Sequence, residues 1–393
     1  MNMQKAPIKE LISNFKGINF TLQFGDGECV QVGNTPSDFK VILKEPIHTL
    51  DFILSYTLAF GEAYMNGNLE IEGNLYEALD AILKFKNHFH THFHLLPELF
   101  HTSTSASHQK KQVSSHYDLG NDFYKLWLDE TMSYSCAYFK SSLDTLYEAQ
   151  MNKIHHILSK LNLQKGQSLL DIGCGWGHLL IEAAKLYKVH GVGITLSQEQ
   201  YDGFNARIQA ENLQDYLEVK LMDYRELANS DLCFDRIVSV GMLEHVGRNH
   251  YKLFLSCIDH VLKDGGLVLL HYISSQIESP GDAWIKKYIF PGGVIPSLRE
   301  IVSLLPNYHD YIIDIESLRR HYTQTLLMWA DNFENALPQV HKMFGEKFIR
   351  MWRMYLASCA ACFNNGVVDL HQILFTKGVN NELPMTRDYL YTK

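Results

Sequence analysis

Short apolar segments alternate with stretches of helical periodicity from about residue 113 onward. The apolar segments predict seven strands, at residues 168–173, 190–195, 216–223, 235–241, 267–273, 311–317 and 371–377. Strands that alternate with helices are typical of a mostly parallel sheet covered by helices. We therefore predict the α/β class, with a doubly wound, Rossmann-like sheet of seven strands that includes an antiparallel edge strand.

The first hundred residues have a different pattern. The segment INFTLQF at 18–24 has the character of a strand, and residues 75–85 have helical periodicity. The stretch HTSTSASHQKK at 101–111 is small and polar without periodicity, which is typical of a linker. We predict a smaller N-terminal α+β domain over 1–100, a linker over 101–112 and a catalytic domain over 113–393.

Composition and charge narrow the class of protein. Hydrophobic residues make up 46% of the chain and charged residues 20%, which is ordinary for a globular enzyme. The formal net charge of −9 argues against a bulk electrostatic interaction with nucleic acid. Aromatic residues reach 12%, with 21 Phe and 21 Tyr, and this richness favours deep apolar pockets or contact with lipid.

The compartment is inferred from the cysteines and from the N-terminal residues. Seven cysteines are an odd number without regular spacing, and MNMQKAPIKELISNFKG has lysines but no apolar signal core. No apolar run approaches the length that spans a bilayer. We expect a cytoplasmic protein with reduced thiols, whose membrane contact is peripheral and on the inner face.

Two sequence features could in principle bind metal. His88, His90, His92 and His94 alternate in HFHTHFH, and a strand would place all four on one face. A helix end beside a linker would scatter them, and we favour that interpretation. Cys359 and Cys362 form a CxxC that could be a redox site or half of a zinc site. It lies in a helical context without a second CxxC, so we favour neither role.

A glycine-rich turn follows the first predicted strand of the catalytic domain. LLDIGCGWGHLL places Asp171 before Gly173 and Gly175, between a strand and a helix. Glycines serve where the backbone turns tightly and approaches a ligand. The next strand ends in Thr195 instead of the acidic residue that a dinucleotide site needs. The turn resembles motif I of S-adenosylmethionine-dependent methyltransferases, a superfamily that commonly contacts adenine at the position of Asp223.

Longer motifs extend this resemblance to one family. They are HYDLGNDFYKLWLD (116–129), YSCAYF (134–139), LLDIGCGWG, TLSQEQ (195–200), GMLEHVG (241–247), LLHYI (269–273), IFPGG (289–293) and HYTQTLLMW (321–329). Together they resemble the cyclopropane-fatty-acyl-phospholipid synthase family, which includes the mycolic acid cyclopropane synthases. The resemblance covers about 113–380, and the additional N-terminal segment resembles the phospholipid-acting bacterial members.

The resemblance implies a reaction and a base. In the family, the methyl group of S-adenosyl-L-methionine is transferred to a cis double bond of an acyl chain, and loss of a proton from the resulting carbocation closes a cyclopropane ring. A dry pocket protects the cation from water. The family uses bicarbonate as the base, held at the positions of Cys136, Glu244, His271, the Ile273 backbone and Tyr322. Cys136 is then a wall of an anion site and not a nucleophile. Cys359 matches a family cysteine once considered catalytic.

The resemblance also implies cofactor contacts. Tyr134 and Ser135 match positions at the methionine carboxylate, and the glycine-turn residues Asp171, Gly173 and Gly175 lie under the methionine and ribose. Positions at the ribose and adenine are matched by Thr195, Gln200, Asp223 and Tyr224. The mycolic enzymes have Gly-Trp where Asp223-Tyr224 stand. The segment from His116 is expected to cover the cofactor.

Unsaturated membrane phospholipids and a second copy of the chain are the partners that the family implies. The segment 282–293, DAWIKKYIFPGG, has a composition suited to an interfacial helix, although an ordinary amphipathic helix fits it as well. Two alternatives stay open. The first is methyl transfer to a lipid or small amine without ring closure, and the second is a non-catalytic lipid-binding protein.

Overall fold

The computed structural model describes residues 5–48, 51–52, 55–84 and 119–391. The predicted linker and the four alternating histidines lie outside these described residues. The segment that begins at His116 is described only from residue 119 onward. The chain divides into two compact units. The first unit consists of 1–101, 280–291 and 326–367, and the second of 102–279, 292–325 and 368–393. The predicted domains were continuous stretches of sequence, so 280–291 and 326–367 were placed in the catalytic domain. In the structure, these two segments pack with the N-terminal residues in the first unit.

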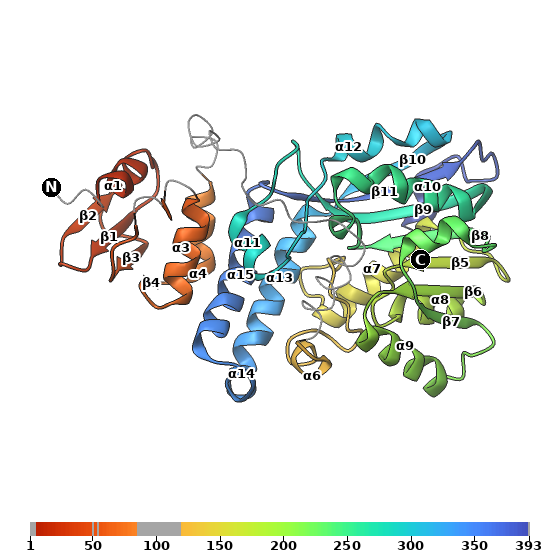
Figure 1. Ribbon diagram of the computed structural model, residues 1–393, viewed down its shortest axis with the longest axis horizontal. Helices are drawn as coiled ribbons and strands as arrows, with labels where there is room; N and C mark the ends of the chain where they lie inside the picture. The colour runs from red at the N-terminus through yellow and green to blue at the C-terminus, as the bar shows by residue number, and fades with distance from the viewer. Residues whose placement is uncertain (1–4, 49–50, 53–54, 85–118, 392–393) are drawn as a thin grey trace. The chain divides into compact units, whose positions relative to one another are not determined.

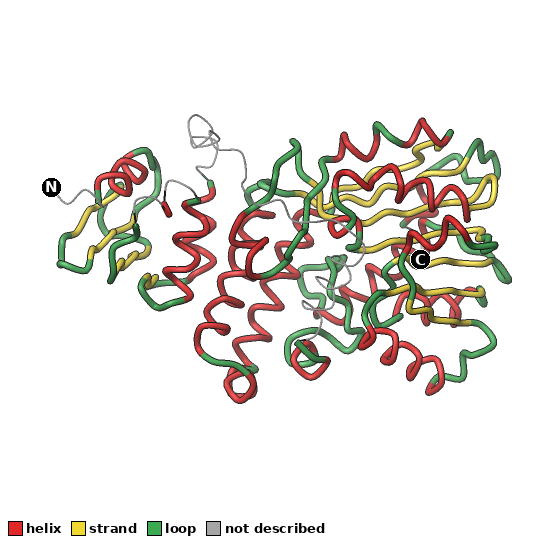
Figure 2. Tube along the Cα trace, viewed as in Figure 1, coloured by secondary structure: helices red, strands yellow, loops and turns green. Residues whose placement is uncertain are grey.

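The described part of the second unit contains the predicted α/β sheet of seven strands (Figures 1 and 2). Its spatial order is β10-β11-β9-β8-β5-β6-β7. The strands are β5 (Ser168–Ile172), β6 (His190–Thr195), β7 (Leu217–Leu221), β8 (Phe234–Val240), β9 (Leu262–Ser274), β10 (Asp310–Ser317) and β11 (Asp369–Lys377). Each predicted strand is confirmed, with β9 longer than expected.

One prediction about this sheet was wrong. The antiparallel strand is not at the edge: β11 runs antiparallel to both β9 and β10, and β10 forms the edge. The residues of β11 explain its place, because Leu370, Ile373 and Phe375 are almost completely buried. The strand β10 exposes Tyr311, Ile313 and other residues, as an edge strand can.

Helices cover both faces of the sheet, as the doubly wound fold requires. On one face, Leu170, Val268 and Leu270 join a hydrophobic cluster with residues of α10 (Tyr251–Val261). On the other, Leu169 and Leu269 join a cluster with residues of α7 (Leu146–Lys160), α8 (His178–Tyr187) and α9 (Gln198–Ala210). Alternate positions of each central strand thus enter opposite clusters, which explains their almost continuous apolar sequence.

Shorter elements complete the second unit. They are α6 (Asn121–Tyr124), η2 (Tyr224–Asn229), η3 (Leu243–His245), η4 (Arg248–His250), α12 (Leu298–Val302), η5 (Leu305–Tyr308) and η6 (Arg387–Leu390). Helix α13 (Arg319–Asn335) begins in the second unit and continues into the first.

The first unit has a small mixed sheet of its own, consistent with the predicted N-terminal α+β domain. Its described strands have the order β2-β1-β3-β4. They are β1 (Phe20–Phe24), β2 (Cys29–Val32), β3 (Phe39–Leu43) and β4 (Leu69–Glu72). Its helices are α1 (Ala6–Ser13), α3 (Tyr56–Met65), α4 (Leu75–Leu83), α11 (Ala283–Tyr288), α14 (Leu337–Met343) and α15 (Glu346–Asn364).

Segments far apart in sequence are joined by polar contacts inside this unit. The buried Asp80 carboxylate of α4 accepts hydrogen bonds of 2.7 Å from the side chains of Asn364 and Asn365 at the end of α15. Arg350 of α15 donates to the carbonyl of Leu69 and to the Glu70 carboxylate. Because α15 needs α4 and β4 as partners, the N-terminal residues are part of this unit's core and not an appendage.

The segment 282–293, for which an interfacial helix and an ordinary amphipathic helix were both open, contributes to this core. Trp284 of α11 is 3% exposed, and its indole N–H donates to the Met65 sulfur at 3.2 Å. An added Cβ at Gly61 would approach the Trp284 ring to 2.3 Å, so the glycine makes room for the indole. Trp284 therefore does not face a membrane. In the described residues, no helix has both the length and the apolar character needed to cross a bilayer.

Candidate active site

The glycine turn after β5 opens a cleft at the carboxyl end of the strand. Gly173, Gly175 and Gly177 have φ values of 84°, 56° and 79°, in the region that favours glycine. A Cβ at Gly177 would lie 2.0 Å from the Phe204 ring, whereas one at Gly175 would meet nothing within 4 Å. The turn is thus packed closely at its helix end and open at Gly175, where its backbone can approach a ligand.

Every cofactor residue predicted from the sequence lines this one cleft. They are Tyr134, Ser135, Asp171, Gly173, Gly175, Thr195, Gln200, Asp223 and Tyr224. Thr195 donates from its hydroxyl to the Gln200 side-chain oxygen at 2.8 Å, and Ser197 caps the helix that carries Gln200. The ends of β5 and β6, together with the segment around Tyr134, therefore assemble the cleft.

Asp223 and Tyr224 are partly occupied by protein contacts. The Asp223 carboxylate accepts from the Arg225 backbone at 2.9 Å and from the Arg225 guanidinium at 3.3 Å. The Tyr224 ring packs edge-on against Phe254, at a centroid distance of 5.2 Å. These contacts hold both residues at the cleft wall and limit how far either can move toward a nucleoside.

Sequence reasoning missed one charged residue of the cleft, Lys153. It lies on α7, is 3% exposed, and donates from Nζ to the Ser135 hydroxyl at 3.1 Å. Gln150, one turn earlier, donates to the Ser135 carbonyl at 2.9 Å. Lys153 and Gln150 could have been identified from the sequence, because a lysine and a glutamine on the apolar side of an amphipathic helix are unusual there.

A second polar group forms where β8 and β9 end. The Glu244 carboxylate, in η3 after β8, accepts a 2.6 Å hydrogen bond from the Ile273 backbone through Oε1. Its other oxygen, Oε2, is enclosed and has no hydrogen-bond partner among the described residues. Burial raises the pKa of Glu244 to about 7, although the Ile273 N–H opposes the shift. Near neutral pH this carboxyl can therefore both hold and release a proton.

His271 is two residues before Ile273 on β9 and is 1% exposed. Gln372, its register partner on β11, donates from Nε2 to the His271 Nδ1 at 3.1 Å. This assignment places the imidazole hydrogen on Nε2, which is buried and without a partner in the described chain. Burial lowers the pKa of His271 well below its usual value, so the ring is neutral. Sequence reasoning missed Gln372, because only the strand register makes it a neighbour.

Cys136 and Tyr322 lie near the start of α13. The Cys136 thiol donates to the carbonyls of Ala137 at 3.3 Å and Leu318 at 3.8 Å, and the Tyr322 N–H donates to the same Leu318 carbonyl. Leu318 in turn donates to Leu370, which is the β11 partner of Ile273. A continuous run of backbone contacts thus connects these residues to Glu244. Burial raises the pKa of Cys136 far above its usual value, which leaves an uncharged thiol unsuited to nucleophilic attack.

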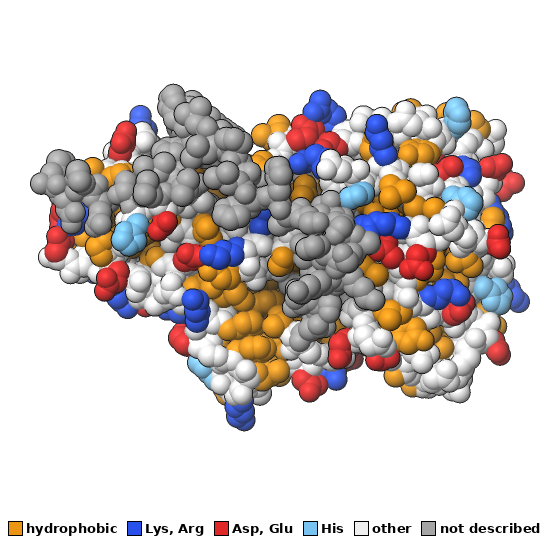
Figure 3. Space-filling model, in the orientation of Figure 1, with side chains coloured by type: hydrophobic (Ala, Val, Ile, Leu, Met, Phe, Trp, Pro, Cys, Tyr) orange, Lys and Arg blue, Asp and Glu red, His pale blue; other side chains and the backbone are white. Residues whose placement is uncertain are grey.

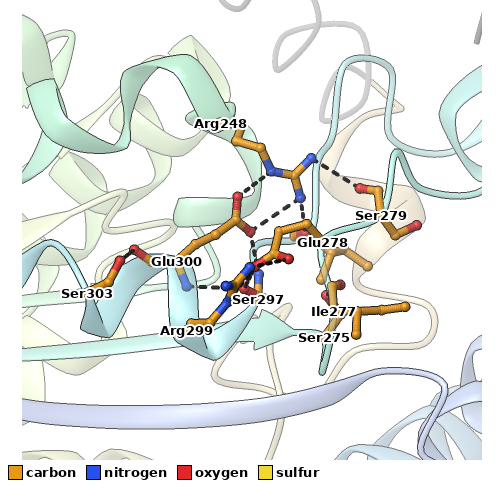
Figure 4. A network of polar contacts seen from close by, with 10 residues as sticks. Arg248, Ser275, Ile277, Glu278, Ser279, Ser297, Arg299, Glu300 and Ser303 are labelled. Atoms are coloured by element: carbon orange, nitrogen blue, oxygen red, sulfur yellow. Dashed lines mark hydrogen bonds and ion pairs between the residues drawn. The ribbon is translucent and has the colours of Figure 1, made fainter.

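A polar network connects Arg248 and Glu300 with the segments that contain Ser279 and Ser297 (Figure 4). Arg248 pairs with Glu300 and donates to the carbonyls of Ser279 at 3.2 Å and Ile295 at 3.4 Å. The Val294 N–H, next to Ile295, donates to the Glu244 carbonyl at 2.9 Å. The network therefore joins the segment after β9 to the segment before α12 and steadies the turn that carries Glu244.

Cys359 belongs to the first unit and is not among the residues that line the cleft. It lies in α15, as the helical context of CAAC predicted, and burial raises the pKa of its thiol well above the usual value. Within the described residues, no group of His, Cys, Asp and Glu is arranged to hold a metal ion.

Comparison with known proteins identifies the family. A family model described as mycolic acid cyclopropane synthetase matches residues 104–373, which is more than half of the chain. The chain belongs to this family. A second model, a domain of unknown function designated DUF7884, matches residues 7–93.

Relatives of known name cover almost the whole chain. The cyclopropane-fatty-acyl-phospholipid synthase of Escherichia coli K12 is 37% identical over 362 residues, 90% of this chain and 92% of the relative. A probable fatty acid methyltransferase of Pseudomonas putida is also 37% identical, over 383 residues that span 94% of this chain and 95% of the relative.

Solved structures of cyclopropane synthases align with this chain. The cyclopropane synthase MmaA2 of Mycobacterium tuberculosis aligns with a TM-score of 0.65 at 32% identity, over 68% of this chain and 98% of that one. The mycolic acid cyclopropane synthase CmaA1, complexed with SAH and CTAB, aligns at 0.64 and 34% identity over the same shares. The protein is therefore an S-adenosylmethionine-dependent methyltransferase of the cyclopropane synthase type.

The contact between Gln372 and His271 predicts a positioning role. Gln372→Leu should lower turnover roughly 10–100-fold, the usual cost of losing a partner that orients a functional histidine. The ¹⁵N spectrum of His271, identified by its loss in His271→Asn, should change from one Nε2–H tautomer to a mixture. Thr376→Val is the matched control, because Thr376 is a buried polar residue of the same strand that bonds Gly378. An unchanged tautomer in Gln372→Leu would contradict the role.

The raised pKa of Glu244 predicts a pH dependence of stability. The glutamate pKa is about 4.5 in the unfolded chain, and the pKa of Glu244 is about 7 in the folded protein. The contribution of Glu244 to the free energy of unfolding is therefore complete below pH 4.5 and is lost as the pH rises through 7. Glu244→Gln should abolish this loss, which is up to about 3 kcal/mol in the free energy of unfolding. Urea denaturation at pH 5 and pH 8 measures it, with the exposed Glu130→Gln as control. Equal pH dependence in wild type and Glu244→Gln would contradict the shift.

Proposed function

We propose that the enzyme is a cyclopropane-fatty-acyl-phospholipid synthase. It transfers a methylene group from S-adenosylmethionine to the cis double bond of an unsaturated phospholipid acyl chain, with bicarbonate as the base. The observation that carries this proposal is that two enclosed polar atoms, Glu244 Oε2 and His271 Nε2, have no hydrogen-bond partner among the described residues. They belong to adjacent strand ends, and the neighbours Met242 and His245 line the cofactor cleft.

The cleft fits the proposed cofactor. Its open side at Gly175 admits a bulky ligand close to the backbone, and the buried Asp171 and Ser135 supply polar groups at one end. When bound, S-adenosylmethionine supplies an electrophilic methyl group. The protein's own contribution is to orient that ligand between the ends of β5 and β6 and to keep water from the reacting carbons.

The second polar group fits a small anion that carries a proton. The neutral His271 can donate from Nε2, and Glu244 can donate or accept at Oε2 because its pKa is near 7. His271 is 1% exposed, so this region is shielded from bulk water. When bound there, bicarbonate supplies a base that takes the proton whose loss closes the ring. A carboxyl of ordinary pKa would repel it as a like charge.

A second candidate is methyl transfer to the acyl chain without ring closure. The Pseudomonas putida relative, a probable fatty acid methyltransferase, supports it. Methyl transfer without ring closure also leaves a carbocation, which must lose a proton from a neighbouring chain carbon to give a branched alkene. The enclosed Glu244 and His271 therefore suit this candidate as well. Ring closure stands first because the Escherichia coli relative, 37% identical over 90% of this chain, is a cyclopropane-fatty-acyl-phospholipid synthase.

The product distinguishes the two candidates. Incubation with vesicles of unsaturated phospholipid and S-adenosylmethionine should add one CH2 to the lipid and remove its double bond, as measured by mass spectrometry with ozonolysis. Turnover should fall in buffer stripped of CO2 and recover with added bicarbonate. Glu244→Gln should lower turnover roughly 100-fold or more, the scale of a general acid–base contribution, with unchanged affinity for S-adenosylhomocysteine. A branched product with an alkene would support the second candidate.

We also propose that the protein binds the surface of the bilayer through the turn between α14 and α15. Hydrophobic side chains gather over α13 to α15, with basic side chains near the tip (Figure 3). Met343 at the tip is 43% exposed, and the Phe344 and Phe348 rings stack at a centroid distance of 4.0 Å. Lys342 and Lys347 flank them and complement anionic phospholipid headgroups.

Vesicle flotation tests this surface. Met343→Asp should reduce binding to anionic phospholipid vesicles roughly 10-fold, because an apolar contact is replaced by a charge that the headgroups repel. Met385→Asp is the matched control, since Met385 is a fully exposed methionine of the second unit. Equal losses in both variants, or a loss in neither, would show that this turn is not the contact.

A further inference from the structure

Lys153 is a buried cation that the proposed chemistry does not use. Among the described residues, its one hydrogen bond is to the neutral Ser135 hydroxyl, and none of the ion pairs includes it. The nearest acids act on it through space without direct contact, and burial lowers the pKa of Lys153 to about 8. Burying an unpaired charge lowers the stability of the folded protein unless a counter-ion pairs with it.

The helix α7 holds Lys153 rigidly at the cleft. Its neighbours Ile154 and Ile157 are fully buried in the cluster beneath the sheet. Gln150 donates to the carbonyls of Ser133 and Ser135, so the same helix also holds the cleft segment opposite. The ammonium is therefore fixed beside Ser135 and does not reach solvent, as a flexible lysine would.

An unpaired acid lies in the same cleft. Asp171 is 3% exposed, and its Oδ1 has no hydrogen-bond partner within the described chain. Burial raises the pKa of Asp171 to about 7, and the nearby Lys153 opposes this. One end of the cleft thus contains a buried cation and a buried carboxylate, each without a direct partner of opposite charge.

A ligand with both charges would complete this arrangement. The amino-acid end of S-adenosylmethionine has an α-carboxylate and an α-ammonium on one carbon. We propose that Lys153 binds the α-carboxylate of the cofactor together with Ser135, and so selects ligands that keep the intact amino acid. The orphan oxygen of Asp171 suits the adjacent ammonium. The inference deepens the proposed function only through its cofactor, and is independent of the lipid product and of the base.

Calorimetry with two ligands tests the assignment without any lipid. The ligands are S-adenosylhomocysteine and its decarboxylated analogue, which keeps the amine and lacks only the carboxylate. The wild-type protein should bind S-adenosylhomocysteine more tightly than the analogue. Lys153→Met should lower the affinity for S-adenosylhomocysteine roughly 10–100-fold, which is the contribution of a hydrogen bond to a charged group. The affinity for the analogue should change by less than about twofold.

Controls separate a direct contact from other effects. Lys165→Met removes an exposed lysine of the same unit and should change neither affinity, which tests the effect of net charge. Lys153→Arg keeps the charge and should retain part of the preference for the carboxylate. If Lys153→Met lowers the affinity for both ligands equally, the role of Lys153 is structural. If wild type and Lys153→Met bind S-adenosylhomocysteine with equal affinity, Lys153 does not contact the carboxylate. Either result overturns the assignment, and neither bears on ring closure.

Discussion

Three neighbouring parallel strands, β5, β8 and β9, end at the same edge of the sheet, and both polar sites depend on this constraint. The glycine turn follows β5, Glu244 follows β8, and Ile273 lies at the end of β9. The hydrogen bond from Ile273 to the Glu244 carboxylate joins the last two of these ends. In open α/β sheets a ligand enters the crevice at the carboxyl ends of the strands. The cofactor cleft and the enclosed Glu244–His271 pair therefore lie together because of topology, before any particular side chain is considered.

Several polar side chains at this edge are buried without a full set of hydrogen-bond partners among the described residues. Glu244 Oε2, His271 Nε2 and Asp171 Oδ1 are enclosed polar atoms that the described residues leave without hydrogen bonds. Lys153 is a buried cation whose one hydrogen-bond partner in the described part of the chain is a hydroxyl. Each lowers the stability of the unliganded protein, because desolvation is not offset by pairing. Such costs can persist where a ligand supplies the missing partners, and these atoms lie where a zwitterionic cofactor and a small anion are proposed.

The first unit shows how the remaining parts of the chain are used. Its core combines the N-terminal strands with α11 and α15, which come from much later in the sequence. Trp284, which could have been an interfacial anchor, is instead a core residue against Met65 and Gly61. The turn between α14 and α15, with the exposed Met343 and the half-buried Phe344 and Phe348, is the part of this unit that we propose contacts a lipid surface.

The sequence by itself determined the strands, the glycine turn and the order of the motifs, because each is encoded locally by apolar runs and by residues with special backbone freedom. The residues of the cofactor cleft and Glu244 could also be found from motifs. Only the tertiary structure placed β11 inside the sheet, set Gln372 opposite His271 and brought Lys153 beside Ser135. These facts depend on strand register and on which face of a helix is buried among distant segments, and neither is written in the local pattern of residues.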